Sequence, residues 1–387
     1  MNIANIRRTR PFRHPLLVAG AAALLILTAA PAWAEVPTAT RDTPKLSGVV
    51  WTTVFAGDTV YLGGDFTSVK VGNSTYSRQR LAAFNANTGA LLPWAPSVDS
   101  TVRALAVADG SVYAAGEFVL ANGSVRDNLA KFGALTGALD PVLNLAITGQ
   151  PYALAVGAGR LYLGGSFAAV GSSPRSNLAA VTLSSDTLDP SWTPSADDRV
   201  SSLTVTANRI YAGGRFRRIN GRRDTVRIAA LSPSTGAPDP TFTGYLPYTV
   251  NSVAADSTSV YAGVGGPGGR VTALDNHGAP RWTITTDGDI AAVGALDGTV
   301  YAGGHFDHVC RTARVADIQG DCLDGRVDRV KLFAVNADGQ LSPWIANANG
   351  VVGVLTVATD PVRNRLAVGG AFTTINGVTR NRFAQFG

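Results

Sequence analysis

The chain is poor in the residue types on which many enzymes and membrane proteins depend. Its 387 residues include two cysteines, one methionine and four histidines, and only 16% of them are charged. Beyond residue 34 the only glutamates are Glu35 and Glu117, and the only histidines are His277, His305 and His308. Hydrolysis by paired carboxylates, or by a nucleophile with a histidine base, therefore has few residues to draw on.

No apolar run of about 18 residues follows residue 34, so no membrane span is expected. Residues 1–34 have the pattern of a signal peptide, because four arginines precede an apolar run and Ala32-Trp33-Ala34 comes just before Glu35. We therefore expect a secreted, extracellular protein that begins at Glu35. The formal net charge is +6, and subtracting these four arginines leaves +2 for the remainder, so nucleic acid binding is not implied.

What the sequence has in abundance is a repeated phrase of the type Tyr-x-Gly-Gly-x-Phe. The Gly-Gly-x-Phe part occurs at residues 63–66, 164–167, 213–216, 303–306 and 369–372, with altered copies at 115–118 and 263–266. The copies are mostly about 50 residues apart, which is typical of the blades of a β-propeller. The simplest count is seven blades.

One period of the repeat predicts four strands. Residues 102–107 are apolar on both faces, as a buried inner strand requires, and residues 112–115 follow across the turn Asp109-Gly110. Residues 129–132 form a third strand, and a fourth begins near Asp140-Pro141 after the turn Thr136-Gly137. The prediction is an all-β fold in which residues 35–387 form a single seven-bladed β-propeller of four-stranded antiparallel blades.

The two ends of the chain complement each other. The last copy ends on a third strand at residues 383–386, and residues 39–47 belong to no other strand. We therefore expect residues 35–48 to supply the closing strand of the last blade, since a closed ring leaves no exposed sheet edge.

The phrase at residues 210–216, with Leu188-Asp189-Pro190-Ser191-Trp192 before it and Asp239-Pro240-Thr241-Phe242 after it, resembles the delta-sixty repeat. That repeat forms β-propellers in exported bacterial proteins and has no assigned general function. The order of Tyr-x-Gly-Gly, strand, Thr-Gly turn and Trp is also similar to the kelch repeat. The copper radical oxidases among kelch-like propellers need a histidine, tyrosine and cysteine ligand set that this chain does not offer. The resemblance thus implies a fold and leaves the function open.

Residues that recur in most blades are interpreted as structural. An arginine stands three residues before the third strand at Arg78, Arg126, Arg175, Arg329 and Arg380. These arginines could be anion-binding forks, but we favour buried hydrogen-bonding anchors between blades. Trp94, Trp192, Trp282 and Trp344, with Phe242 at the matching place, are predicted to pack blades together.

Three consecutive blades depart from the pattern between their second and third strands. Blade four carries Arg217, Arg218, Arg222 and Arg223, blade five shortens this connection to residues 265–269, and blade six expands it to residues 310–328. The hypothesis is a groove that binds an anionic group, either a carboxylated glycan or an acidic partner surface. The alternative is a solvated face in which the arginines pair with nearby aspartates.

The expansion in blade six also contains both cysteines. Cys310 and Cys322 are expected to form a disulfide, and a metal site with His305 and His308 is the alternative. Asp321, Asp324 and Asp328 could hold calcium, although an Asp-Gly turn explains their spacing as well. No other cofactor is expected.

The sequence as a whole favours a monomeric binding or interaction module, with a protein or a glycan as its partner, over an enzyme. A glycan-active hydrolase or lyase with its site at the mouth of the channel is the alternative. Its acid and base would be drawn from Asp99, Asp198 and Asp289, which precede inner strands.

Overall fold

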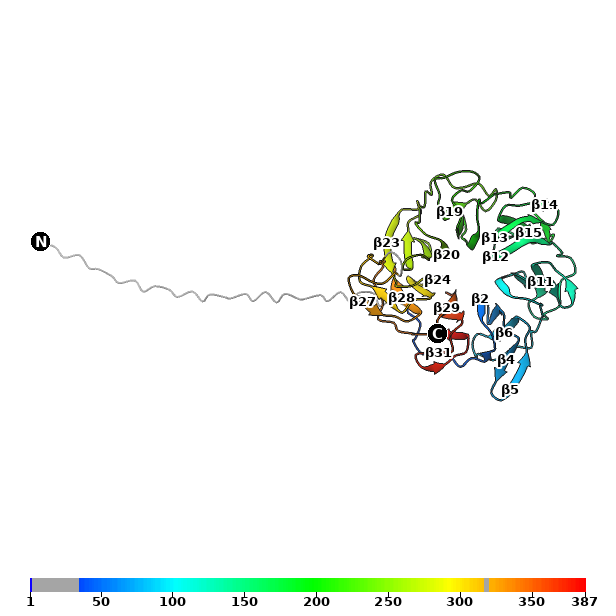
Figure 1. Ribbon diagram of the computed structural model, residues 1–387, viewed down its shortest axis with the longest axis horizontal. Coiled ribbons are helices and arrows are strands. Elements are labelled where there is room, and N and C mark those ends of the chain that lie inside the picture. Colours follow the sequence, from blue (N-terminus) through cyan, green and yellow to red (C-terminus); the bar gives the residue numbers. More distant parts are fainter. Residues whose placement is uncertain (2–34, 317–319) are drawn as a thin grey trace. The chain divides into compact units, whose positions relative to one another are not determined.

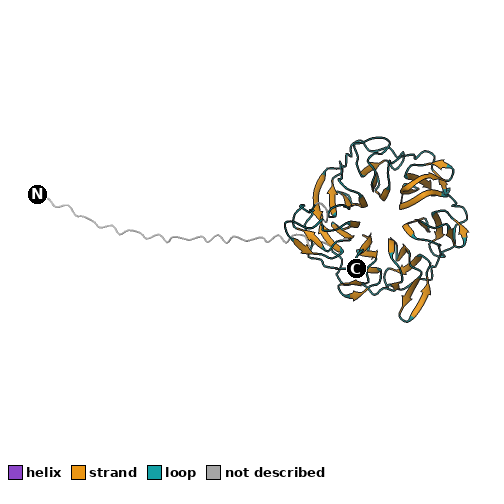
Figure 2. Ribbon diagram, in the orientation of Figure 1, coloured by secondary structure: helices purple, strands orange, loops and turns teal. Residues whose placement is uncertain are grey.

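The computed structural model describes Met1, residues 35–316 and residues 320–387. The predicted signal peptide, residues 1–34, lies outside the described residues apart from Met1. Contacts divide the chain between Ala32 and Trp33, and every described strand belongs to the second unit. Every helix or strand in the described residues is a β-strand (Figure 2), and none of these residues forms a helix long and apolar enough to cross a membrane.

Seven sheets in the described residues share one layout and are numbered here in chain order. Sheet 1 contains β2 (Val50–Ala56), β3 (Thr59–Gly64) and β6 (Leu81–Asn85); sheet 2 contains β7 (Val102–Ala108), β8 (Ser111–Gly116) and β11 (Leu129–Gly133); sheet 3 contains β12 (Ile147–Gly157), β13 (Arg160–Val170), β15 (Leu178–Thr182) and β16 (Thr187–Leu188). Sheet 4 contains β17 (Val200–Val205), β18 (Ile210–Gly214) and β19 (Ile228–Leu231); sheet 5 contains β20 (Val250–Ala255), β21 (Val260–Val264), β22 (Arg270–Leu274) and β23 (Pro280–Thr285). Sheet 6 contains β24 (Ile290–Leu296), β25 (Thr299–Gly304) and β28 (Leu332–Asn336), and sheet 7 contains β29 (Val354–Asp360), β30 (Arg365–Gly370) and β33 (Phe383–Phe386).

Short strands extend the connections between second and third strands. They are β4 (Ser68–Val71) with β5 (Ser74–Ser77), β9 (Leu120–Ala121) with β10 (Ser124–Val125), β14 (Ser173–Pro174) against β13, β26 (His308–Cys310) with β27 (Arg326–Asp328), and β31 (Thr374–Ile375) with β32 (Val378–Thr379). In sheet 4 the only bridge described within this connection joins Ile219 to Arg222, and in sheet 5 the connection is reduced to a few residues.

The sheets follow one another around a common axis with their first strands innermost (Figure 1). Each first strand packs against the first strand of the next sheet, and β29 packs against β2. All pairings within the sheets are antiparallel. The fold is therefore all-β and propeller-like.

The fourth strand is shorter than the sequence predicts. Only β16 and β23 are true fourth strands, whereas sheets 1, 2, 4 and 6 hold single bridges at Leu91, Leu139, Pro238 and Leu341. The physical reason is proline, which cannot donate to a ladder: it follows closely at Pro93, Pro141, Pro240 and Pro343, and Pro190 in sheet 3 follows a fourth strand of only two residues. Sheet 5 has no proline after Pro280, and its fourth strand runs for six residues.

The paired glycines are explained by close packing. A Cβ on Gly63 would lie 2.6 Å from Cγ1 of Val102 in the next sheet, and one on Gly369 would lie 2.5 Å from Cγ1 of Val50 in sheet 1. The second glycine of the pair meets backbone, since a Cβ on Gly64 would collide with the carbonyl oxygen of Val49. The first glycine thus lets neighbouring sheets approach, and the second accommodates the start of the first strand.

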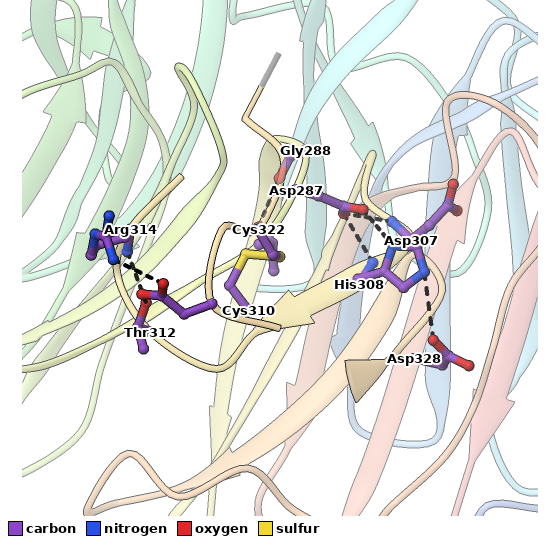
Figure 3. Close-up of a disulfide and its surroundings, with 11 residues drawn as sticks. Asp287, Gly288, Asp307, His308, Cys310, Thr312, Arg314, Cys322 and Asp328 are labelled. Atoms are coloured by element: carbon purple, nitrogen blue, oxygen red, sulfur yellow. Dashed lines mark hydrogen bonds and ion pairs between the residues drawn. A yellow bond between two sulfur atoms is a disulfide. The ribbon is translucent and has the colours of Figure 1, made fainter. Parts of the chain in front are cut away.

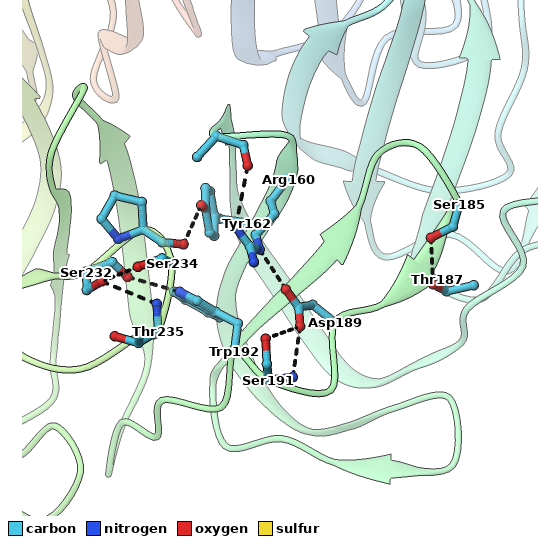
Figure 4. A network of polar contacts seen from close by, with 12 residues as sticks. Arg160, Tyr162, Ser185, Thr187, Asp189, Ser191, Trp192, Ser232, Ser234 and Thr235 are labelled. Atoms are coloured by element: carbon cyan, nitrogen blue, oxygen red, sulfur yellow. Dashed lines mark hydrogen bonds and ion pairs between the residues drawn. The ribbon is translucent and has the colours of Figure 1, made fainter.

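Aromatic side chains join neighbouring sheets. In Figure 4, Trp192 Nε1 donates to the carbonyl oxygen of Ser232 at 3.2 Å, and the ring of Tyr162 lies 5.1 Å from that of Trp192. Tyr162 Oη donates to the carbonyl oxygen of Pro233, so both side chains of sheet 3 form hydrogen bonds with the same turn of sheet 4. Trp94 bonds the carbonyl oxygen of Gly133 in the same way. These tryptophans pack sheets together, as predicted.

A buried carboxylate supports the same region of sheet 3. Asp189 accepts hydrogen bonds from Ser191 and from Nε of Arg160 at 2.6 Å (Figure 4). Burial by itself would raise the pKa of Asp189, but these hydrogen bonds and the Arg160 charge outweigh it and lower that pKa to about 2.

The recurring arginines act within a sheet rather than between sheets, which corrects the prediction. Arg78 donates to the carbonyl oxygen of Leu92 at 2.8 Å, and Arg329 donates to that of Ser342 at 2.9 Å. Both acceptors lie in the segment that follows the third strand of the same sheet. Backbone carbonyl oxygens therefore already accept hydrogen bonds from these guanidinium groups. This argues against the alternative in which the arginines form a ring of anion-binding forks.

Residues near the N-terminus lie along the last sheet. Thr40 forms an antiparallel bridge with Phe386, and Arg41 N–H donates to the carbonyl oxygen of Gln385 at 2.8 Å. Arg380 donates hydrogen bonds to the Oγ1 and the carbonyl oxygen of Thr40. Thr40 therefore supplies the acceptor that, for the other recurring arginines, comes from the segment after the third strand. Beyond it, β1 (Lys45–Leu46) pairs with β4 of sheet 1.

Candidate functional site

The first strands contain a recurring irregularity that shapes the axis of the fold. Opposite the Gly-Gly positions of the repeat, the pairing of each first strand with the second strand skips one residue. The skipped residues are Trp51, Arg103, Tyr152, Ser201, Asn251, Ala291 and Leu355. A bulge of this kind leaves one residue unpaired and re-aims its side chain. The chain thus presents one variable side chain per sheet at the same level of the axis.

These seven residues and Arg199 line one cavity of about 290 Å³, which we call the axial pocket. All eight side chains are partly exposed. The pocket lies at the end of the sheets that also carries the connections between second and third strands, because Val50 at the start of β2 pairs with Gly64 at the end of β3. The volume suits a small molecule or a side chain of a partner.

Arg103 is held firmly on one side of the axial pocket. Its guanidinium carbon lies 4.1 Å from the centroid of the Trp51 ring, and its Nη2 lies 2.6 Å from Oε1 of Glu117. Glu117 occupies the variable position between the glycine and the phenylalanine of the repeat. The Trp51 Nε1–H is shielded from solvent and has no hydrogen-bond partner among the described residues. Arg103 is therefore preorganised, and its charge is offset by a carboxylate.

Arg199 has different surroundings. Its guanidinium carbon lies 5.2 Å from the centroid of the Tyr152 ring, and its Nε donates to Ser201 Oγ at 3.2 Å. In the described part of the chain no carboxylate oxygen lies within 4.0 Å of its guanidinium nitrogens. Arg199 thus offers an uncompensated cation beside an aromatic face.

The remaining wall of the axial pocket is less polar. Asn251 donates its Nδ2 hydrogen bond to the carbonyl oxygen of Ile290 at 2.9 Å, which leaves its side-chain oxygen available as an acceptor. Ala291 and Leu355 add an apolar side. The pocket therefore joins cationic, aromatic and apolar surfaces, and its lining residues include no aspartate or glutamate.

The four arginines of the predicted groove lie on one connection, and their role as an anion site stays a prediction. Arg217, Arg218, Arg222 and Arg223 are all exposed on the connection between β18 and β19. Arg222 forms an ion pair with Asp224, and the hydrogen bond from Arg222 lowers the pKa of that carboxyl group. None of the four lines the axial pocket.

The backbone around these arginines is fixed by an acidic side chain. Asp197 accepts the N–H groups of Arg217 and Arg218 at 2.7 and 2.9 Å. Asp99 makes the equivalent pair of bonds to Val119 and Leu120 in sheet 2. These aspartates serve the backbone of the connections.

The other two aspartates proposed as acid and base of the alternative enzyme also accept hydrogen bonds from backbone N–H groups. Asp198 accepts the N–H of Arg199 at 2.6 Å and lies 3.8 Å from Nε of Arg215. Asp289 accepts the N–H of Gly266 at 2.9 Å. Neither lines the axial pocket. Among the described residues, no pair of carboxylates faces the cavity to act as acid and base.

Figure 3 shows that Cys310 and Cys322 form the predicted disulfide, with their Cα atoms 5.1 Å apart. His308 Nδ1 lies 2.6 Å from Asp287 Oδ2, and its Nε2 lies 3.5 Å from Asp328 Oδ1. Burial would raise the pKa of Asp287, but the hydrogen bonds that it accepts from His308 outweigh burial and lower it.

The disulfide occupies both sulfurs that the alternative metal site would need. Asp324, one of the proposed calcium ligands, accepts hydrogen bonds from Thr312 Oγ1 and Arg314 Nη1. Across the described ranges, no group of three or more histidine, cysteine, aspartate or glutamate side chains is placed to hold a metal ion.

The axial pocket could have been found from the repeat. In each first strand, the residue just before the skipped position is Val, Ile or Pro, and the skipped position changes from sheet to sheet: Trp, Arg, Tyr, Ser, Asn, Ala and Leu. A position that varies within an otherwise regular phrase is a candidate for function, as are the arginines that break the pattern between β18 and β19. The bulge that turns these positions toward the axis has no comparable sequence signal.

Comparison with known folds places this structure in the β-propeller class. The WD40 β-propeller domain of Doa1, seen in a crystal structure, superposes with a TM-score of 0.56 at 13% identity, covering 92% of this chain and 97% of that one. The computationally designed Ika8 protein gives a TM-score of 0.49 at 14% identity, covering 90% of this chain and 99% of that one. At these identities the likeness concerns the fold alone.

The sequence itself matches a family. Residues 108–141 and 364–387 match the model described as "Domain of unknown function (DUF5122) beta-propeller", which confirms the predicted likeness to a β-propeller family without an assigned function. No curated protein matches the chain.

Proposed function

We propose that this chain is an exported binding module built as a seven-bladed propeller, with each of the seven sheets as one blade. The contact between β29 and β2 supports a complete ring. The bridge between Thr40 and Phe386 supports residues 35–48 as the closing strand of the last blade. The disulfide between Cys310 and Cys322 is compatible with an oxidising, extracellular environment.

The function that the axial pocket supports best is recognition of an anionic group, carried either by a carboxylated glycan or by an acidic partner surface. The observation that carries this proposal is Arg199, whose guanidinium lines the pocket beside Tyr152 and has no carboxylate partner among the described residues. A carboxylate that accepts hydrogen bonds from an arginine gains about 1.5–3 kcal/mol per charged hydrogen bond. An aromatic face beside it can cover the apolar side of a sugar ring or a side chain.

The exposed arginines of the β18–β19 connection are proposed as secondary contacts. Arg217, Arg218 and Arg223 form no ion pair with another described residue, and they lie on the end of the sheets that carries the axial pocket. Their charge would raise the local concentration of an anionic partner and speed its association. Arg222 is the weakest of the four predicted contacts, because Asp224 already neutralises it.

The test is a binding screen of residues 35–387 on an array of carboxylated and neutral glycans and acidic peptides. We expect an anionic ligand whose affinity falls at least about tenfold in Arg199→Gln, which corresponds to about 1.4 kcal/mol. Arg363→Gln is the matched control, since Arg363 lies in the β29–β30 turn at the other end of the sheets. Equal binding by wild type and Arg199→Gln would reject the axial pocket as the site.

A measurement of binding kinetics tests the secondary contacts separately. Replacing Arg217, Arg218 and Arg223 together with Ser should slow association at low salt while leaving the dissociation rate nearly unchanged. An unchanged association rate would remove these three residues from the proposal.

A further inference from the structure

Of the two arginines that line the axial pocket, only one has a carboxylate partner among the described residues, and the proposed function does not by itself explain this difference. The lining of the pocket includes two cationic side chains, Arg103 and Arg199. Arg103 is paired with Glu117 through both Nε, at 2.8 Å, and Nη2, at 2.6 Å. Two positive charges and one negative charge leave a net charge of +1 for this group of residues.

Neighbouring acidic residues do not change this balance in the cavity. Asp198 is directed to the N–H of Arg199 and to Arg215, and Asp289 to the N–H of Gly266. Neither aspartate lines the axial pocket. The charged side chains that line the pocket are Arg103 and Arg199, and Glu117, although not itself a lining residue, pairs directly with Arg103.

The wall opposite Arg199 holds the side chains of Leu355 and Trp51, and the cation stacked on Trp51, Arg103, is already paired with Glu117. Arg199 and Ser201 come from blade 4. Leu355 comes from blade 7 and Trp51 from blade 1, which lie on the far side of the ring of seven blades. A carboxylate beside Arg199 would place the body of the ligand against Leu355 and Trp51. A second negative charge there would meet no free cation and would lose its hydration, which costs free energy.

We propose that the axial pocket selects a singly charged carboxylate attached to a compact ring or other non-polar body, and that Glu117 sets this preference by neutralising Arg103. This inference rests on the proposed function, because it assumes that Arg199 binds an anion. It adds the ligand class and assigns Glu117 as a specificity-determining residue. With Glu117 neutral, the same pocket would carry two free cations and would accept a dianion.

The test uses two probes that share a saturated six-membered ring: cyclohexanecarboxylate, with one charge, and cyclohexane-1,3-dicarboxylate, with two. Dissociation constants are measured by NMR titration on the chain from residue 35 onward. Wild type should bind the monoanion at least about fivefold more tightly than the dianion. In Glu117→Gln that ratio should fall to about one or invert, because two free cations face the ligand.

Two variants control for trivial causes. Asp109→Asn removes one negative charge from the β7–β8 turn, at the opposite end of β7 from Arg103, and asparagine tolerates the left-handed backbone there (φ 48°). It should keep the wild-type ratio. The double variant Arg103→Gln with Glu117→Gln restores a net charge of +1 and should also keep the wild-type ratio, which separates charge from damage to the fold.

The outcomes distinguish the two proposals. If both probes bind and both depend on Arg199, but their ratio does not respond to Glu117→Gln, the charge selection is wrong and the anion site stands. If the double variant loses the preference as the single variant does, charge is not its cause and the inference is rejected. If neither probe binds and no array ligand depends on Arg199, the proposed function itself fails.

Discussion

Val36 offers the sharpest test of how the chain completes its last sheets. Its side chain is 1% exposed and belongs to a buried cluster with Tyr301, Trp344 and Phe386. Its N–H donates to Tyr301 Oη at 2.9 Å, and its carbonyl oxygen accepts from Trp344 Nε1 at 2.8 Å. In sheets 1 and 3 the corresponding tyrosine and tryptophan both donate to carbonyl oxygens in a turn of the next sheet, so Val36 takes the place of such a turn.

The change Val36→Ala keeps both backbone hydrogen bonds and removes only buried carbon. Two methyl groups at about 0.8 kcal/mol each give about 1.6 kcal/mol of lost transfer free energy. The cavity that remains adds to this, because the surrounding aromatic rings relax only partly, so the free energy of unfolding should fall by about 2–3 kcal/mol.

Urea denaturation measures this change. With a slope of about 3 kcal/mol per M, a loss of 2 kcal/mol lowers the midpoint by about 0.7 M. Val362→Ala is the matched control, since Val362 is 84% exposed in the β29–β30 turn, and its midpoint should stay near that of wild type. If Val36→Ala is within about 0.5 kcal/mol of this control, residue 36 does not pack in the core and the reasoning is refuted.

Four further predictions concern stability. Trp94→Phe leaves the carbonyl oxygen of Gly133 without its donor and should cost about 1 kcal/mol in urea denaturation, whereas no change would mean that water replaces the bond. Because the pKa of Asp189 is lowered to about 2, its contribution of about 2 kcal/mol is present above pH 4 and lost between about pH 4 and pH 2; Asp189→Asn should flatten this part of a stability–pH curve, and an equally steep curve would contradict the assignment. Replacing Cys310 and Cys322 with Ser should lower the free energy of unfolding by about 3 kcal/mol, and equal stability would show that the loop adds no constraint. A chelator should leave the melting temperature unchanged, and a fall would point to a calcium ion on the aspartates of the sheet 6 insertion.

Much of the fold could be predicted because it repeats. The glycine pair, the tyrosine and the tryptophan each recur at a period of about 50 residues, and each answers a local requirement that is the same in every sheet. The fourth strand is shorter than the repeat predicts, since the prolines near Leu91, Leu139, Pro238 and Leu341 reduce its pairing to single bridges. The partner of the recurring arginines differs from the prediction, because their acceptor is a carbonyl oxygen that only the folded sheet brings near.

The sequence alone determined the strand pattern, the likeness to a propeller family and the disulfide, since these depend on residue type and short spacing. Only the tertiary structure decided the candidate site. The axial pocket takes one residue from each of seven sheets, and a bulge in each first strand turns that residue toward the axis. The pairing of Arg103 with Glu117, and the absence of such a partner for Arg199 among the described residues, follow from that geometry rather than from any local pattern. Residues about 50 positions apart become neighbours only when the sheets surround one axis, and no local propensity records that arrangement.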